Sequence, residues 1–247
     1  MFGATRTFRA NQASSGTQVW AKAPPGGPGG SPVVAQGRVI SGQKGLEAVD
    51  IASGSRIWAT SQFPATIRFA PAIDGGMVFA TFGQLAAFRA SSGALLWSVS
   101  GGFLSSPSAS DGVVYVGGDD GLHAFEEADG SPVWTAPVPA GASTPAIANG
   151  VLYIGGEDGM LYALDQPTGQ TIWTDDLGGG IESSPAVANG VVYVGSTSGT
   201  MYAVAAATGT TLWSGTTNAS IGTSSPAVVD GHVFIGDEGG FVYCFGL

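Results

Sequence analysis

The sequence predicts an all-β protein: a six-bladed β-propeller whose blades are four-stranded antiparallel sheets. Two periodic markers lead to this prediction. Six tryptophans recur at intervals of 38, 39, 37, 39 and 40 residues, at Trp20, Trp58, Trp97, Trp134, Trp173 and Trp213. A proline opens each unit, at Pro32, Pro71, Pro107, Pro145, Pro185 and Pro226. A period of about 40 residues with several short strands per unit is typical of propeller blades.

The unit is clearest between Ser143 and Trp173. A Ser-Thr-Pro-Ala-Ile segment is followed by three short apolar runs, at Val151–Ile154, Met160–Leu164 and Gln170–Trp173, and an Asn-Gly, Asp-Gly or Thr-Gly pair precedes each run. Gly and Asn accept the positive φ that tight turns require, so we expect these runs to be strands of a meander. The opening proline lacks an N–H group and suits an edge strand. The tryptophan that ends each unit is expected to bury its ring between neighbouring blades.

The blades are expected at about 31–60, 69–99, 105–136, 143–175, 183–215 and 224–247, within a single domain of residues 1–247. The last blade lacks a fourth strand and a tryptophan, whereas residues 1–30 hold a spare strand at Thr17–Ala21 besides an N-terminal arm. We therefore expect residues 17–21 to pair with Phe241–Phe245, complete the last blade and close the ring. The segment TFRANQASSGTQVW also matches a third-plus-fourth-strand hairpin such as AAFRASSGALLW, which would supply the third strand twice.

Charge is distributed very unevenly along the 247 residues. All eight Lys and Arg residues lie in 1–89, whereas residues 90–247 carry 15 acidic groups and no Lys or Arg. Most of the surface would therefore repel a phosphate backbone, which argues against nucleic-acid binding. The chain contains neither an apolar run long enough to span a membrane nor a recognisable signal peptide. The single cysteine, Cys244, cannot form an internal disulfide and is expected to be a small buried residue; we expect a monomer.

The stretch ALDQPTGQTIW from Ala163 and the strands GVLYIGG and GVVYVGS fit the pattern A-x-D-x-x-T-G-x-x-x-W preceded by G-x-x-Y-V/I-G. This pattern resembles the pyrroloquinoline-quinone (PQQ) repeat of quinoprotein-type propellers, and the resemblance covers nearly the whole chain. Arg89 and Ala205 depart from it, because they replace the motif's aspartate. The resemblance implies the propeller fold and an extracytoplasmic location.

Members of this family divide by function. The dehydrogenases have eight blades, a bound quinone, a calcium ion and often a vicinal cysteine pair, and this chain is too short and has one cysteine. Non-catalytic members include the outer-membrane assembly lipoprotein of Gram-negative bacteria and sensor domains of membrane kinases. The resemblance therefore favours the non-catalytic branch, in which neither PQQ nor calcium is expected as a cofactor. The fold alone does not decide function.

The sequence contains no recognisable catalytic or cofactor-binding set. His123 and His232 occupy strand positions that hold Tyr or Val in sister units, so they are expected to be substitutions within the repeat. The Ser-Ser-Pro and Ser-Thr-Pro segments have no histidine beside them, and their hydroxyls are expected to bond edge backbone or water. We therefore predict no catalytic residues.

Acidic residues gather at one set of loops. In a meander, the turns between second and third strands emerge on the same face as the connections between blades. That face is expected to collect Asp119, Asp120, Glu157, Asp158, Asp175, Asp176, Glu182, Asp237 and Glu238. Asp and Glu beside Gly are also ordinary turn residues in solvent. Six of them are weak candidates for calcium ligands, since hard cations bind clustered carboxylates: Asp119, Asp120, Glu157, Asp158, Asp237 and Glu238.

The predicted function is a non-catalytic binding or scaffolding propeller that takes a protein partner at this acidic face and at the channel mouth. Two alternatives stay open. One is a sensor propeller that binds a small ligand or a carbohydrate. The other is an enzyme, a PQQ-dependent dehydrogenase.

Overall fold

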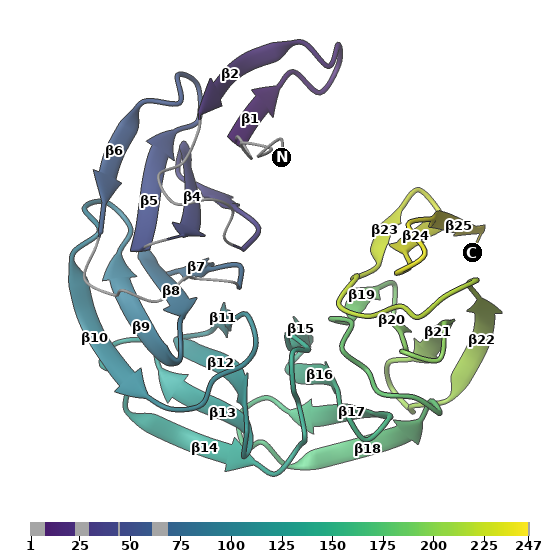
Figure 1. Ribbon diagram of the computed structural model, residues 1–247. Coiled ribbons are helices and arrows are strands. Elements are labelled where there is room, and N and C mark those ends of the chain that lie inside the picture. Colours follow the sequence, from purple (N-terminus) through teal and green to yellow (C-terminus); the bar gives the residue numbers. More distant parts are fainter. Residues whose placement is uncertain (1–7, 23–29, 44, 61–68, 247) are drawn as a thin grey trace, which may run out of the picture. The chain divides into compact units, whose positions relative to one another are not determined.

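The computed structural model describes residues 8–22, 30–43, 45–60 and 69–246. The described residues form strands and turns (Figure 1), and among them is no helix that is long and apolar enough to cross a membrane. Residues 1–7 and 23–29 of the predicted N-terminal arm lie outside the described residues. The chain divides into two compact units, residues 1–112 with 127–130 and residues 113–126 with 131–247.

The strands of the first unit form one hairpin and two four-stranded antiparallel sheets. The hairpin pairs β1 with β2, and the sheets have the orders β3-β4-β5-β6 and β7-β8-β9-β10. Their bounds are β1 (Phe8–Asn11), β2 (Gln18–Lys22), β3 (Val33–Ala35), β4 (Arg38–Gln43), β5 (Gly45–Asp50), β6 (Arg56–Ala59), β7 (Ala72–Asp74), β8 (Met77–Thr81), β9 (Gln84–Arg89), β10 (Leu95–Ser100) and β11 (Ser108–Ser110).

The second unit repeats the same antiparallel order. In it β12, β13 and β14 pair in sequence, followed by the sheets β15-β16-β17-β18, β19-β20-β21-β22 and β23-β24-β25. Their bounds are β12 (Val113–Gly118), β13 (Gly121–Glu126), β14 (Pro132–Ala136), β15 (Ala146–Ala148), β16 (Val151–Gly155), β17 (Met160–Asp165), β18 (Thr171–Asp176), β19 (Ala186–Ala188), β20 (Val191–Gly195), β21 (Thr200–Ala205), β22 (Thr211–Thr216), β23 (Ala227–Val229), β24 (His232–Gly236) and β25 (Val242–Gly246).

The turns explain why these short runs pair in one register. Between β15 and β16, Asn149 and Gly150 have φ of 52° and 76°, and Ala148 lies opposite Val151. Two successive residues with positive φ make the tight hairpin turn whose twist matches that of its strands. The all-β fold of four-stranded antiparallel blades is thereby confirmed.

The hydrophobic core lies between successive blades. The two central strands of a blade are largely buried, whereas the fourth strand is half exposed, as the contrast between β16 and β18 shows. One core cluster joins Tyr153 and Leu161 of one blade to Val192 and Val204 of the next. Each such buried aliphatic side chain contributes about 1.5–3 kcal/mol to the free energy of folding.

The tryptophans connect consecutive blades in a constant geometry. In each complete pairing of third and fourth strands, the register shifts near the tryptophan, as it does between Ala163 and Leu164 opposite Trp173. Such a bulge bends the strand and re-aims its side chain. Trp173 then donates from Nε1 to the carbonyl oxygen of Ala206 over 3.0 Å, and its ring lies against Gly209.

Four other tryptophans make the same bond to the turn of the following sheet. Each acceptor precedes the turn glycine by three residues: Trp20 to Ile51, Trp58 to Ala90, Trp97 to Glu127 and Trp134 to Gln166. Buried serines add a second series of contacts. Ser143 Oγ accepts from Gly155 N and donates to the carbonyl of Ser183, so one hydroxyl joins two blades. These serines therefore bond backbone, as predicted.

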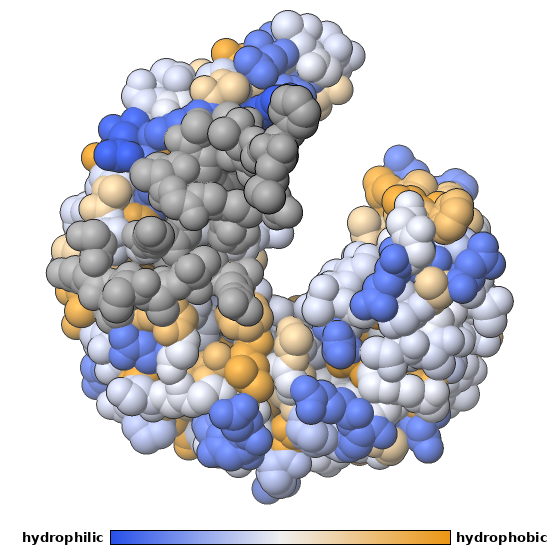
Figure 2. Space-filling model, in the orientation of Figure 1, coloured by the Kyte–Doolittle hydropathy of each residue, from blue (hydrophilic) through white to orange (hydrophobic). Residues whose placement is uncertain are grey.

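The described part of the last sheet is β23-β24-β25, and β2 pairs with β1 in a separate hairpin. The expected pairing of Thr17–Ala21 with Phe241–Phe245 would join the two units, and the ring closure stays a prediction. Phe8–Asn11 supplies a third-type strand to β2, the hairpin that the match of TFRANQASSGTQVW to AAFRASSGALLW indicates. Cys244 is exposed on β25, and the expectation that it is buried is wrong. Figure 2 shows hydrophobic surface at this end, where Val242 is 77% exposed.

Candidate functional site

The acidic loop face belongs to the second unit. Its turns lie between β12 and β13, β16 and β17, and β24 and β25, and they adjoin the connections that lead from one blade to the next. The amides of Glu157, Thr197 and Glu238 donate to the carbonyls of Pro139, Gly180 and Ser220 in those connections. The backbone thus holds the turns and the connections at the same end of their sheets, the arrangement that the meander predicts.

The nine acidic residues of this face differ in exposure. Asp119, Asp120, Glu157, Asp158, Asp176 and Glu238 are exposed, and Asp175, Glu182 and Asp237 are half-buried. The second unit has no Lys or Arg that could neutralise them. The face therefore carries a concentrated negative charge, which attracts cationic partners and falls off with ionic strength.

Two of the aspartates build the turns in which they lie. Asp158 accepts from Met160 N at 3.1 Å and from the Tyr162 hydroxyl at 2.5 Å. Asp237 repeats the pattern with Phe241 N at 3.0 Å and the Tyr243 hydroxyl at 2.9 Å. Burial and the Asp158 carboxylate raise the pKa of Tyr162 to about 12. The backbone amide of Phe241 is the main cause that lowers the pKa of Asp237.

Three further aspartates are also engaged. Asp120 Oδ1 lies 2.7 Å from His123 Nε2, and this hydrogen bond lowers the pKa of Asp120. Asp175 accepts from Thr211 Oγ1, and Asp176 accepts from the Gly178 amide. These contacts support the ordinary structural role of turn aspartates.

Glu157 and Glu238 are placed differently. Each follows a second strand, and each side chain lies over a glycine of the preceding connection: a Cβ on Gly141 would meet Glu157 Oε1 at 2.4 Å, and one on Gly222 would meet Glu238 Oε1 at 2.6 Å. Glycine at these two positions thus leaves room for each carboxylate beside the connection, and the amides of the glutamates bond the connection's carbonyls. These two carboxylates, together with Asp119 and Glu182, take part in no hydrogen bond or ion pair that the described structure contains.

The structure does not gather the calcium candidates into a ligand set. Asp119, Asp120, Glu157, Asp158, Asp237 and Glu238 lie on three separate turns. Within the described ranges, no group of three or more His, Cys, Asp or Glu residues is arranged to hold a metal ion. Calcium coordinates six to eight oxygens, so this donor set does not fit the ion.

The histidines occupy structural positions. His123 lies between Asp120 and Thr135 Oγ1, at 2.7 and 3.1 Å. His232 Nδ1 lies 2.9 Å from the carbonyl oxygen of Asp230. His123 thus bonds a carboxylate and a threonine hydroxyl of its own sheet, and His232 bonds the backbone two residues before it.

Sequence reasoning missed a buried carboxylate in the first unit. Glu127 is 4% exposed, and its backbone carbonyl accepts the indole of Trp97 at 2.7 Å. Its side chain reaches the turn after β7, where a Cβ on Gly75 would lie 3.4 Å from Glu127 Oε2. Burial, the charge of Asp74 and its hydrogen bond, and the charge of Asp111 raise the pKa of Glu127 to about 7. The signal in the sequence is that Glu127 takes the position three residues before the turn glycine. Other blades have Ile51, Ala90, Gln166 and Ala206 at this position.

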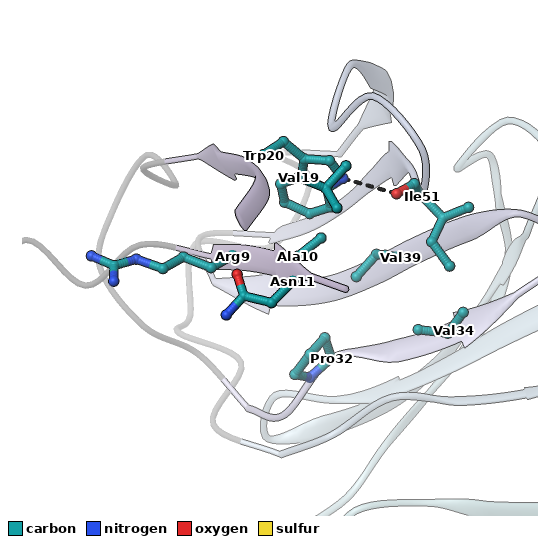
Figure 3. A pocket seen from close by; sticks show the side chains of 9 residues that line it. All are labelled: Arg9, Ala10, Asn11, Val19, Trp20, Pro32, Val34, Val39 and Ile51. Atoms are coloured by element: carbon teal, nitrogen blue, oxygen red, sulfur yellow. Dashed lines mark hydrogen bonds between the residues drawn. The ribbon is translucent and has the colours of Figure 1, made fainter. Parts of the chain in front are cut away.

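A pocket in the first unit was also missed. It has a volume of about 420 Å³ and lies between the β1–β2 hairpin and the sheet that begins with β3 (Figure 3). Its lining is mostly apolar and consists of Arg9, Ala10, Asn11, Val19, Trp20, Pro32, Val34, Val39 and Ile51. No motif predicts it, because it depends on which strands pair beside β2.

A family model described as outer membrane protein assembly factor BamB, a PQQ-like repeat, matches residues 3–66, 42–144 and 118–245. The chain belongs to this PQQ-repeat family. A search of curated proteins gives no match.

Solved structures share the fold of this PQQ-repeat chain. BamB from Moraxella catarrhalis is 23% identical, with a TM-score of 0.80 over 94% of this chain and 77% of that one. The computationally designed Ika8 protein is 16% identical, with a TM-score of 0.81 over 94% and 75%. A europium-containing methanol dehydrogenase is 13% identical, with a TM-score of 0.76 over 97% and 69%.

Proposed function

We propose that the chain is a non-catalytic scaffold that binds a basic segment of a partner protein at the acidic loop face of its second unit. The observation that carries this proposal is the set of exposed carboxylates in a unit without Lys or Arg, in which the backbone amides of Glu157 and Glu238 bond the connections between blades. Loop faces on a rigid scaffold are common binding surfaces. The family model is described as an assembly factor, which supports a role in binding proteins and a location outside the cytoplasm.

A basic peptide tests this proposal. We expect a labelled deca-lysine peptide to bind the protein, and the double variant Glu157→Gln/Glu238→Gln to bind it about tenfold more weakly at low salt, because two unpaired carboxylates are lost. Fluorescence anisotropy at two salt concentrations provides the measurement. The affinity of the unaltered protein should fall as the salt concentration rises.

The matched control removes the same charge elsewhere in the unit. Glu126 and Asp230 are exposed and lie outside the acidic loop face, at the end of β13 and in the turn before β24. The variant Glu126→Gln/Asp230→Asn should keep nearly the full affinity for the peptide. Equal weakening by both double variants would show that net charge alone, and not this face, attracts the peptide.

The enzymatic alternative has a direct test. The likeness to a europium-containing methanol dehydrogenase is a likeness of fold. The dehydrogenases that the repeat resembles hold a calcium ion beside the quinone, and the carboxylates of the described residues are not arranged to hold a metal ion. Quinone absorbance retained after gel filtration, together with dye-linked alcohol oxidation once PQQ and calcium are added, would replace the scaffold proposal.

A further inference from the structure

Two acidic residues of the first unit depart from the repeat, and the structure brings them together. Asp74 is the last residue of the first strand of its sheet. The other sheets have uncharged residues at this position, namely Ala35, Ser110, Ala148, Ala188 and Val229. Glu127 likewise takes a position that is uncharged in the other blades, and its carboxyl group is hydrogen-bonded to that of Asp74. The repeat itself therefore requires neither carboxyl group.

Glu127 lies where the turn of residues 127–130 meets the preceding sheet. Its amide donates to the carbonyl oxygen of Gly112 at 2.8 Å, and its own carbonyl accepts the indole N–H of Trp97 at 2.7 Å. Its carboxyl group reaches the turn between β7 and β8, since a Cβ on Gly75 would lie 3.4 Å from Oε2. All of these residues belong to the first unit. A displacement of the Glu127 side chain therefore acts on the residue that accepts the indole.

The carboxyl group of Glu127 lies in acidic surroundings. The residue is 4% exposed, and its Oε1 has no hydrogen-bond partner among the described residues. Burial is the main cause that raises the pKa of Glu127 to about 7, and Asp74 and then Asp111, which adjoin the turns after β7 and β11, raise it further. Two carboxylates so close together cannot both ionise at low cost. At lower pH a proton lies between Glu127 and Asp74, and at higher pH the two groups repel each other.

The other charged groups of these elements do not neutralise the pair. Glu126, at the end of β13, and Asp129, in the same turn as Glu127, are acidic and exposed. Arg89 ends β9 opposite Met77 and is also exposed, and it is not among the groups that shift the pKa of Glu127. The charge of the pair therefore follows the pH.

We propose that Asp74 and Glu127 form a pH-sensitive clasp, which holds the turn of residues 127–130 against the sheet β7-β8-β9-β10 while the pair shares a proton and loosens the turn when the proton is lost. The closed turn binds this proton more tightly than an open turn, because only the closed turn buries Glu127 beside Asp74. The contribution of the clasp is therefore complete below pH 4.5, the ordinary pKa of Glu127, and is lost as the pH rises through about 7. Loosening of this turn releases the indole of Trp97 and leaves the other junctions closed.

Hydrogen exchange of the indole N–H groups tests the clasp within one sample. Trp97 donates to Glu127, whereas Trp134 donates to Gln166, the uncharged residue at the equivalent position of the next turn. We expect the protection of the Trp97 indole, corrected for intrinsic exchange, to fall about tenfold between pH 6 and pH 8. Linkage gives this factor for a proton bound with a pKa of about 7 in the closed turn and 4.5 in the open one. The Trp134 indole should show no such fall. Nuclear magnetic resonance of the isotope-labelled full chain measures both.

Three variants separate the pair from its surroundings. Glu127→Gln stays neutral and can donate to Asp74, so the Trp97 indole should remain protected at both pH values. Asp74→Asn removes the partner charge and leaves the burial of Glu127, so the fall should become smaller. Glu126→Gln removes an exposed charge one residue earlier and should leave the fall unchanged. Circular dichroism shows whether each variant is folded, and Asp74→Asn decides the matter if Glu127→Gln is not.

Four results would overturn the proposal. The first is no fall for Trp97, and the second is an equal fall for Trp97 and Trp134, which would indicate opening of the whole protein. The third is a fall that persists in Glu127→Gln. The fourth is an unchanged fall in Asp74→Asn, which would show that burial alone controls Glu127 and that the pair forms no clasp.

Discussion

Gly169→Ala is expected to lower the free energy of unfolding by about 3 kcal/mol, through overpacking and a strained positive φ together. Gly169 has φ of +69°, and a Cβ there would lie 2.5 Å from Cε3 of Trp134. The indole cannot withdraw without losing its bond to the carbonyl of Gln166. The turn and the ring are both parts of the contact between two blades, so the strain is not easily relieved. Urea unfolding followed by tryptophan fluorescence measures the loss.

Gly150→Ala is the matched control. Gly150 is a turn glycine of the same unit with φ of +76°, and a Cβ there would have nothing within 4 Å. Gly150→Ala is expected to lower the free energy of unfolding by only about 1 kcal/mol, the cost of a left-handed conformation for an L-residue. The difference between the two variants isolates the contact with Trp134. Equal losses would show that backbone strain, and not the docked indole, determines the need for glycine in these turns.

Glu127→Gln is expected to stabilise the protein at pH 8 by about 2 kcal/mol and to remove a pH dependence of stability between pH 5 and 7. The folded protein binds the Glu127 proton with a pKa of about 7, against an ordinary value of 4.5. Between these values the folded state holds a proton that the unfolded chain has released. The stability that this bound proton gives the unaltered protein is therefore complete below pH 4.5 and is lost as the pH rises through 7. Glutamine stays neutral throughout and can donate to Asp74.

The neighbouring exposed carboxylate supplies the comparison for this prediction. Glu126→Gln removes the same charge one residue earlier and should leave the slope of stability against pH unchanged. Thermal melts at intervals of half a pH unit, about the resolution needed for a single titration, give the two curves. A slope that persists in Glu127→Gln would assign the pH dependence to other groups.

The repeat itself was predictable from the sequence because its contacts are local and periodic. Trp173 and Gly209 recur at fixed positions, and their types follow from what each position must do, namely fill the gap between blades and turn the chain with a positive φ. The acidic loop face followed from topology alone, since a meander sends alternate turns to one end. Which of its carboxylates bond within their own turns was not predictable. Asp158 and Asp237 bond their own turns, whereas Glu157 and Glu238 lie over glycines of another segment.

What the sequence did not predict depends on contacts that do not follow the period. The raised pKa of Glu127 requires Asp74 and Asp111, which come from the turns of two different blades. The pocket beside Trp20 depends on the pairing of β2 with β1, and TFRANQASSGTQVW allowed more than one pairing. A spacing of tryptophans cannot decide which of two similar strands occupies an edge.

The uniform junction between blades has a consequence for how such chains change length. Each complete blade carries its own tryptophan and its own receiving turn, so every module ends with the group that the next module accepts. Duplication or deletion of one stretch of about 40 residues leaves each remaining junction with both of its halves. The number of modules can therefore change in a single genetic step that leaves the tryptophan and turn residues of the remaining junctions unchanged.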